Sequence, residues 1–201
     1  LIGSGGSGNI SIHHNLFAHN RDRNPMITTR DGPVDLVNNV IYNMGHGIGA
    51  YDNAGETQLN IVGNYFKYGN NTDRNQFEIK PFRARDGYGH SLYVVGNIGP
   101  HRPTDEYPED VLIAEDARWY VTEERHDAPV VSTTSAQEAY DQVLASAGAT
   151  LPERDRIDYW LMQDLINEGG WWPDEMEDVH GWTYMLRGNA PRDSDFDGMP
   201  N

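Results

Sequence analysis

The segment SIHHNLFAHNRDRNPMITTR, residues 11–30, concentrates cationic and basic side chains in a chain that is otherwise acidic. It contains three histidines and three arginines, among them His13, Arg23 and Arg30. A guanidinium group binds a carboxylate through two parallel N–H donors and keeps its charge at any physiological pH. The segment therefore favours the binding of a compact anionic ligand.

A second cationic group lies in the segment EIKPFRAR, residues 78–85. Lys80, Arg83 and Arg85 stand close together there, in a stretch that we interpret as a loop. Two readings stay open for this loop. It either adds cations to the anion-binding site or is a solvated surface loop.

Carboxylates alternate in the final segment DSDFDGMPN, where Asp193, Asp195 and Asp197 precede Gly198. Oxygen ligands at alternate positions before a glycine are typical of the start of a calcium-binding loop. The later ligand of such loops does not follow in the sequence. Weak calcium binding and a disordered acidic tail are therefore both compatible with this segment.

The overall charge excludes some classes of partner. The chain has 201 residues, a net charge of −16 and no cysteine. Residues 1–85 contain 8 Lys and Arg against 7 Asp and Glu, whereas residues 86–201 contain 7 against 24. A net negative chain binds nucleic acid poorly, and no apolar run reaches the roughly 18–20 residues of a membrane span. We expect neither nucleic acid nor a membrane as a partner.

A repeat in the first hundred residues indicates which elements position these side chains. Four segments share the pattern apolar–x–apolar–x–x–Asn–x–apolar, the last without its final position: ISIHHNLF (10–17), VDLVNNVI (34–41), LNIVGNYF (59–66) and LYVVGNI (92–98). Alternating apolar residues predict a strand with one buried face, and a repeat of about 25 residues predicts a solenoid. The fold class predicted is all-β, a right-handed parallel β-helix.

The shared asparagines predict how the coils stack. We expect Asn15, Asn39, Asn64 and Asn97 to lie at one corner of successive coils and to hydrogen-bond to one another, because a buried amide needs partners. The alternative is a β-sandwich with Asn in its hairpins. The extra residues before the fourth copy, 70–90, are interpreted as a loop.

The pattern changes after residue 100, where we predict a partly helical C-terminal extension. Residues 135–150, with Ser135 as the N-cap, and residues 152–170, with Pro152 at the start, each show a helical apolar stripe. We expect both helices to pack on the solenoid. The predicted division is β-helix coils over 1–100, with the ligand-binding coil at 10–30, the extension over 101–190, and the acidic tail over 191–201.

The chain opens on LIGSGGSGNIS, with no initiator Met and no signal peptide. A first coil without a cap would expose apolar side chains and strand edges. We therefore expect this chain to be part of a longer precursor. Its own upstream β-helix half should stay associated, as a nicked or separate chain.

The residues quoted above carry a resemblance to a known family. LIGSGG…ISIHHNLFAHNRDRNP resembles the catalytic coil of polysaccharide lyase family 1, the pectate lyases. AYDQVLASAGATLPERDRID is similar to the tail of bacterial members, and DSDFDGMPN resembles the acidic loop that often follows it. The resemblance implies a parallel β-helix that cleaves α-1,4-linked galacturonan by β-elimination, secreted or periplasmic.

The resemblance also implies roles for individual residues. The Arg of the family's Arg-x-Pro step acts as the catalytic base, which is Arg23 here. The alternative for Arg23 is a surface salt bridge with Asp22 or Asp31. A second, substrate-binding Arg normally follows five residues later, but Thr28 occupies that position, and Arg30 on the same strand face is expected to replace it. The family's calcium ligands and a conserved Lys would lie upstream of this chain, so calcium is the expected cofactor.

The residues themselves suggest further contacts. Alternation with Ile10 and Ile12 directs His14 inward and His13 outward. His13, Lys80, Arg83 and Arg85 are expected to contact the acidic substrate.

Two other functions remain alternatives. The first alternative is a non-catalytic β-helix module that binds acidic polysaccharide. The second is a lyase that acts on another uronate polymer. GHG at 45–47 matches a step in polygalacturonases, but the aspartates that those hydrolases need are missing from the coils, so the match is interpreted as chance.

Overall fold

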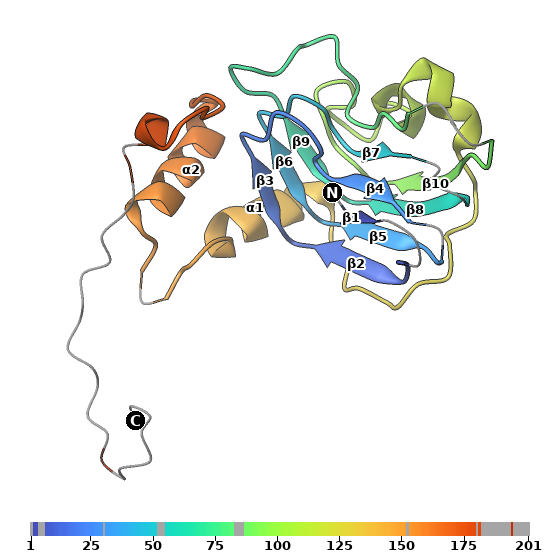
Figure 1. The fold of residues 1–201 in the computed structure, drawn as a ribbon, viewed down its shortest axis with the longest axis horizontal. Helices are drawn as coiled ribbons and strands as arrows, with labels where there is room; N and C mark the ends of the chain where they lie inside the picture. Colours follow the sequence, from blue (N-terminus) through green and yellow to red (C-terminus); the bar gives the residue numbers. More distant parts are fainter. Residues whose placement is uncertain are drawn as a thin grey trace.

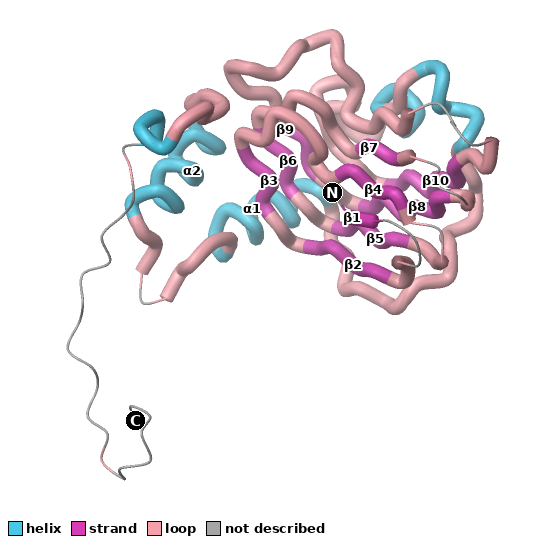
Figure 2. Tube along the Cα trace, in the orientation of Figure 1, coloured by secondary structure: helices cyan, strands magenta, loops and turns pink. Residues whose placement is uncertain are grey.

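In the computed structural model the chain forms three parallel β-sheets with a few helices (Figures 1 and 2). The structure describes residues 2–3, 7–29, 31–51, 55–82, 87–151, 153–179, 181 and 194. The first sheet contains β1 (Ile2–Gly3), β4 (Met26–Thr28) and β7 (Gly49–Ala50). The second contains β2 (Ile10–His13), β5 (Val34–Val37), β8 (Thr57–Val62) and β10 (His90–Val95). The third contains β3 (Leu16–Ala18), β6 (Val40–Tyr42) and β9 (Tyr65–Lys67).

Each of the first three passes of the chain adds one strand to each sheet, and the fourth adds β10 to the second sheet, an arrangement compatible with a parallel β-helix. The predicted register of the repeat is confirmed. Ile10 pairs with Val34, Val34 with Leu59, and Leu59 with Leu92. The apolar residues of adjacent passes therefore stack on one another inside the molecule.

The core is built from these stacked residues. Val34, Leu36 and Ile61 are completely buried in the core cluster, and Asp35 and Asn60, which alternate with them, lie on the other face of the sheet, where they are also buried. Complete burial of a Val, Leu or Ile side chain contributes about 1.5–3 kcal/mol. The alternating pattern thus fixes the strand faces, because a shift by one residue would move every apolar side chain to the opposite face of the sheet.

The predicted asparagine ladder is present. The backbone N–H and the side-chain amide of Asn15 donate to Asn39 Oδ1, both at 3.1 Å. Asn39 donates in the same way to Asn64 at 3.0 and 3.1 Å, and Asn64 to Asn97 at 2.9 and 3.0 Å. The second amide hydrogen of Asn64 reaches the carbonyl of Leu36 at 2.8 Å. Buried amides are thereby satisfied at each level of the stack.

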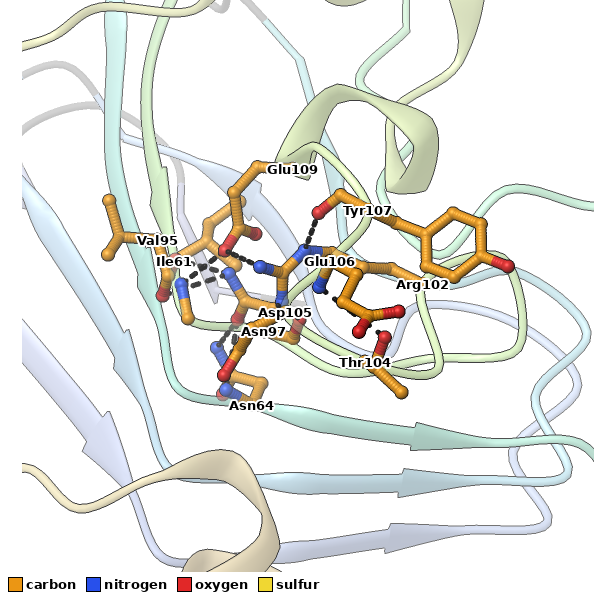
Figure 3. A network of polar contacts seen from close by, with 11 residues as sticks. Ile61, Asn64, Val95, Asn97, Arg102, Thr104, Asp105, Glu106, Tyr107 and Glu109 are labelled. Atoms are coloured by element: carbon orange, nitrogen blue, oxygen red, sulfur yellow. Dashed lines mark hydrogen bonds and ion pairs between the residues drawn. The ribbon is translucent and has the colours of Figure 1, made fainter.

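An arginine ends this ladder (Figure 3). Arg102 is almost completely buried, and its Nη1 donates to the carbonyl of Asn97 at 2.6 Å. Its Nε donates to the carbonyl of Tyr107 at 2.8 Å, and it forms ion pairs with Asp105 at 3.0 Å and Glu109 at 3.4 Å. Burial raises the pKa of Glu109 despite the neighbouring guanidinium. The ladder is therefore anchored to the segment that follows the fourth repeat.

Parallel pairing extends further than the repeat indicated. Ile79, within the segment interpreted as a loop, pairs with Ile48 on one side and with Ile113 on the other. Val121 pairs with Leu92. Residues 70–90 are therefore not only a loop, and part of the stretch after residue 100 adds a further level to the stack. The 3₁₀ helices η1 (Glu109–Leu112) and η2 (Glu115–Tyr120) lie in this stretch.

Two helices cover the third sheet. α1 (Ala136–Ser146) begins after the predicted N-cap Ser135, which forms a reciprocal capping box with Glu138. α2 (Arg156–Asn167) is capped by Asp155, so it begins later than predicted; Pro152 lies outside the described residues. Val143 and Leu165 pack with Val40 and Tyr42. A short 3₁₀ helix, η3 (Met176–Val179), follows.

The second sheet is covered by a strap between η2 and α1. Asn60 exchanges hydrogen bonds with the backbone of His126, and Asn38 with that of Thr134. Arg125 forms an ion pair at 2.6 Å with the buried Asp35.

Among the described residues, no helix is long and apolar enough to cross a lipid bilayer.

The ladder predicts a large loss of stability on mutation. Asn64→Ala removes the acceptor of two donors of Asn39 and the donor to the Leu36 carbonyl. Since each buried polar group left unpaired costs about 1–3 kcal/mol, we expect the free energy of unfolding in urea to fall by about 3 kcal/mol. Asn75→Ala, in an exposed loop, is the control. A loss below about 1 kcal/mol for Asn64→Ala, or equal losses for both variants, would contradict the role of the ladder.

Candidate active site

Arg23 lies in a tight turn directly before β4, with its side chain about half exposed. Its backbone is left-handed, with φ at 66°. A residue other than Gly, Asn, Asp or His rarely adopts this conformation, which costs about 1–3 kcal/mol and persists only where the surroundings impose it. Such residues cluster at functional sites, so this backbone supports a functional role for the turn.

A buried asparagine imposes the conformation. Asn24 is completely buried, and its amide donates to the carbonyl of Asn20 at 3.0 Å and to that of His46 at 2.7 Å. Asn20 in turn donates to Asn24 Oδ1 at 3.1 Å. The turn is thus fixed from both of its sides, and Arg23 is presented at the surface.

Close contact between successive levels explains why glycine occupies positions 45 and 47 of the GHG segment. A Cβ atom on Gly45 would lie 1.8 Å from the carbonyl oxygen of Arg21, and one on Gly47 would lie 2.0 Å from that of Glu78. No side chain fits at either position. The two glycines therefore let the backbone beside Arg23 stack, and His46 between them is exposed next to the turn.

Asp22 links the two basic groups. Its Oδ2 lies 3.5 Å from Arg23 Nε, and its Oδ1 lies 3.1 Å from His46 Nδ1. All three side chains are about half exposed. Exposed ion pairs contribute only about 0–1 kcal/mol to stability, so these contacts orient Arg23 rather than stabilise the fold.

An aromatic pair continues the surface on the next levels. The rings of Tyr51 and Phe82 are stacked with their centroids 4.4 Å apart, and His46 meets Phe82 edge-on at 6.4 Å. Lys80 directly follows the buried Ile79 and is exposed. The outer surface of the first sheet thus carries cations and aromatic rings together, which suits a ligand with both carboxylates and apolar faces.

The other predicted residues are placed differently. His13 is exposed, as predicted, but it lies on β2 of the second sheet, with its Nδ1 3.0 Å from that of His14. His14 does not face the core as predicted; it lies in a left-handed turn and interacts with Gln142 of α1. Burial and the neighbouring His13 lower the pKa of His14. The structure therefore brings Lys80 to the same sheet as Arg23 and leaves His13 on another.

Several predicted residues lie outside the described part of the chain. They are Arg30, Arg83, Arg85, Asp193, Asp195 and Asp197. Their predicted roles in binding substrate or calcium stay predictions. Within the described residues, no group of three or more His, Cys, Asp or Glu side chains is arranged to hold a metal ion.

Sequence reasoning named Asp22 as a salt-bridge partner of Arg23 but missed His46, Tyr51 and Phe82 as members of this surface. One feature of the sequence could have shown that His46 lies beside Asp22. Asp22 and His46 are 24 residues apart, which is one repeat, so they occupy equivalent places on adjacent levels. The aromatic pair gave no such signal, because Tyr51 only follows the two-residue strand β7 and Phe82 lies outside the assigned strands.

Comparison with known proteins gives relatives of one kind. The protein named "Probable pectate lyase C" in Aspergillus fumigatus is 32% identical over 96% of this chain. Its namesakes in Aspergillus terreus and Emericella nidulans are 29% and 28% identical over 100% and 96% of the chain. The chain is similar to pectate lyases. The resemblance predicted from the sequence is thereby confirmed.

The chain matches only part of each relative. The chain spans about half the length of these pectate lyase relatives, between 45% and 47% in the three cases above. No family model matches the chain, and no solved structure matches it. The activity of the whole protein is therefore a matter of proposal.

Proposed function

We propose that this chain is part of a secreted pectate-lyase-like enzyme, folded as a right-handed parallel β-helix, that cleaves α-1,4-linked galacturonan. The observation that carries the proposal is Arg23, held at the surface of the first sheet by a buried asparagine in a chain similar to pectate lyases. The Arg-x-Pro step, the exposed Lys80 and the aromatic pair support it.

The reaction is a β-elimination. Arg23 removes the proton from C5 of a galacturonate unit, the electron pair forms a C4–C5 double bond, and the bond from C4 to the glycosidic oxygen breaks. That oxygen leaves with the bonding electrons and takes up a proton. Removal of the C5 proton develops negative charge next to the carboxylate, so cations placed there stabilise the transition state. Arg30 is proposed to contact that carboxylate, with Lys80, Arg83 and Arg85 contacting other units; His13, on the second sheet, is not included.

The described residues do not fit a calcium ion, so no step above uses one. We propose that calcium, which would offset substrate charge, is bound by carboxylates on further coils of the same protein. The first level supports such coils. Ile10 and Ile12 are only partly buried, whereas their pairing partners Val34 and Leu36 are completely buried. A preceding coil, on the same or a separate chain, would cover this apolar surface.

The experiment uses the full protein that contains this chain, with polygalacturonate and calcium. Elimination produces an unsaturated uronate that absorbs in the ultraviolet. Binding without new absorbance would identify a non-catalytic module for acidic polysaccharide. Absorbance with another uronate polymer only would identify a different lyase.

Arg23→Lys should abolish most of the turnover. Lysine keeps the charge but lacks the planar fork and cannot occupy the same place. Since a positioned general base contributes about 10²–10⁴-fold, we expect the rate of absorbance increase to fall by about that factor while the thermal melt stays unchanged. Arg21→Lys, an equally exposed neighbour, is the matched control. Substantial turnover by Arg23→Lys would remove Arg23 from the role of base.

The pH dependence follows from the same role. A guanidinium group gives up its proton only at strongly alkaline pH, so the fraction able to act as a base grows as pH rises. We expect kcat of the wild-type protein to increase steadily from neutral into alkaline solution. A maximum at acidic pH, measured by the same absorbance, would contradict an arginine base.

Arg30→Ala should affect binding more than turnover. If Arg30 holds a substrate carboxylate, loss of a charged hydrogen bond worth about 1.5–3 kcal/mol should raise KM about tenfold or more, with a smaller change in kcat. The wild-type advantage should shrink at high salt, because salt screens exposed charges. Arg74→Ala serves as the control. Unchanged kinetics would make Arg30 a surface residue.

A further inference from the structure

A cleft of about 870 Å³ lies between the end of β3, α2 and the segment that contains η3, away from the Tyr51–Phe82 surface. The cleft is lined by aromatic and polar side chains, including Trp160, Trp171, Trp172, His19 and Asp164. Ligand-binding clefts combine a mostly apolar lining with a few placed polar groups, and this volume is within their usual range.

The walls are held rigidly on the solenoid. Trp172 donates from its indole nitrogen to the carbonyl of Asn43 at 2.6 Å, and its backbone N–H donates to Asn71 Oδ1 at 2.8 Å. Lys67 donates to the carbonyl of Leu165 at 2.8 Å, which fixes the end of α2. The cleft therefore belongs to the packed structure and does not depend on a loose appendage.

A buried donor lies among the lining residues. The amide nitrogen of Asn43 lies 2.8 Å from His19 Nδ1, and its Oδ1 accepts from the backbone of Asn71 at 2.8 Å. Nδ1 of His19 must therefore accept, and the proton of the neutral ring lies on Nε2. Nε2 is buried and lies 3.3 Å from Asp164 Oδ2, so the ring is paired with a carboxylate that lines the cleft. His19 thus fixes the partly exposed Asp164 carboxylate in the cleft, where its remaining acceptor positions suit hydroxyl groups.

The charge of the lining selects against acidic ligands. The described residues that line the cleft include the carboxylates of Asp164, Asp174 and Asp178 but no Lys or Arg. Asp178 accepts from the backbone N–H groups of Asp174 and Glu175, so it is already engaged by the chain. A uronate would meet repulsion here, whereas a neutral polyol would find donors, acceptors and indole faces.

We propose that this cleft binds a neutral oligosaccharide. Exposed indole faces stack on the apolar faces of pyranose rings, and Trp171, which is 67% exposed, offers such a face at the rim. Asn20 also lines the cleft and hydrogen-bonds to Asn24, the residue that fixes the Arg23 turn. A sugar chain in the cleft would therefore lie next to the proposed catalytic turn without using it.

The test measures binding, so it is independent of lyase activity. The protein is titrated with cellohexaose, with β-1,4-galactohexaose and with trigalacturonate, by calorimetry and by tryptophan fluorescence. We expect at least one neutral hexaose to bind and to change the fluorescence, with no competition from trigalacturonate. Trp171→Ala should weaken this binding about tenfold or more, with an unchanged thermal melt.

Trp119→Ala is the matched control, because Trp119 is equally exposed, at 71%, on η2 and outside the cleft. It should bind the neutral hexaose like the wild type. The proposal is overturned if neither neutral hexaose binds, if trigalacturonate binds in their place, or if the two tryptophan variants weaken binding equally. Neutral-sugar binding in a protein without lyase activity would refute the proposed function and leave this inference standing.

Discussion

The stacked asparagine ladder is the interaction on which the rest of the structure depends. Each Asn after the first accepts two hydrogen bonds from the Asn of the level before it and donates to that level's backbone, so the register of one level fixes the next. The apolar residues of adjacent levels then pair with one another, because they lie at the same sequence distance from the asparagine of their own level. Everything that lies on the outer surface, Arg23 included, takes its position from this register.

Register also explains why the candidate site is spread over distant parts of the sequence. Asp22 and His46 face each other because they are one repeat apart, and Lys80 reaches the same sheet through the pairing of Ile79 with Ile48. The other two sheets are covered, one by helices and one by a strap. The surface around Arg23 thus combines a fixed backbone with side chains that remain accessible to a polymer.

Much of the fold was predictable, because alternation and a recurring Asn are direct consequences of strand geometry and amide satisfaction. The extra levels at Ile79, Ile113 and Val121 were not, since single-residue pairings leave no alternating pattern. His14 was misplaced for a related reason: the strand ends at His13, and a left-handed backbone interrupts the alternation that the prediction extended. Arg23 was found through its Arg-x-Pro step, whereas the stacking of Tyr51 on Phe82 depends on cross-strand neighbours that no local pattern shows.

We propose that the protein breaks galacturonan by elimination and not by hydrolysis, with Arg23 at the surface of the first sheet abstracting the proton. The most direct measurement is mass spectrometry of the products formed from polygalacturonate in water enriched in heavy oxygen. The account predicts unsaturated oligouronates, each lighter by one water than its saturated counterpart, with no heavy oxygen incorporated at the cleaved bond. Saturated products that carry heavy oxygen from the solvent, or intact polymer after prolonged incubation with calcium, would contradict it.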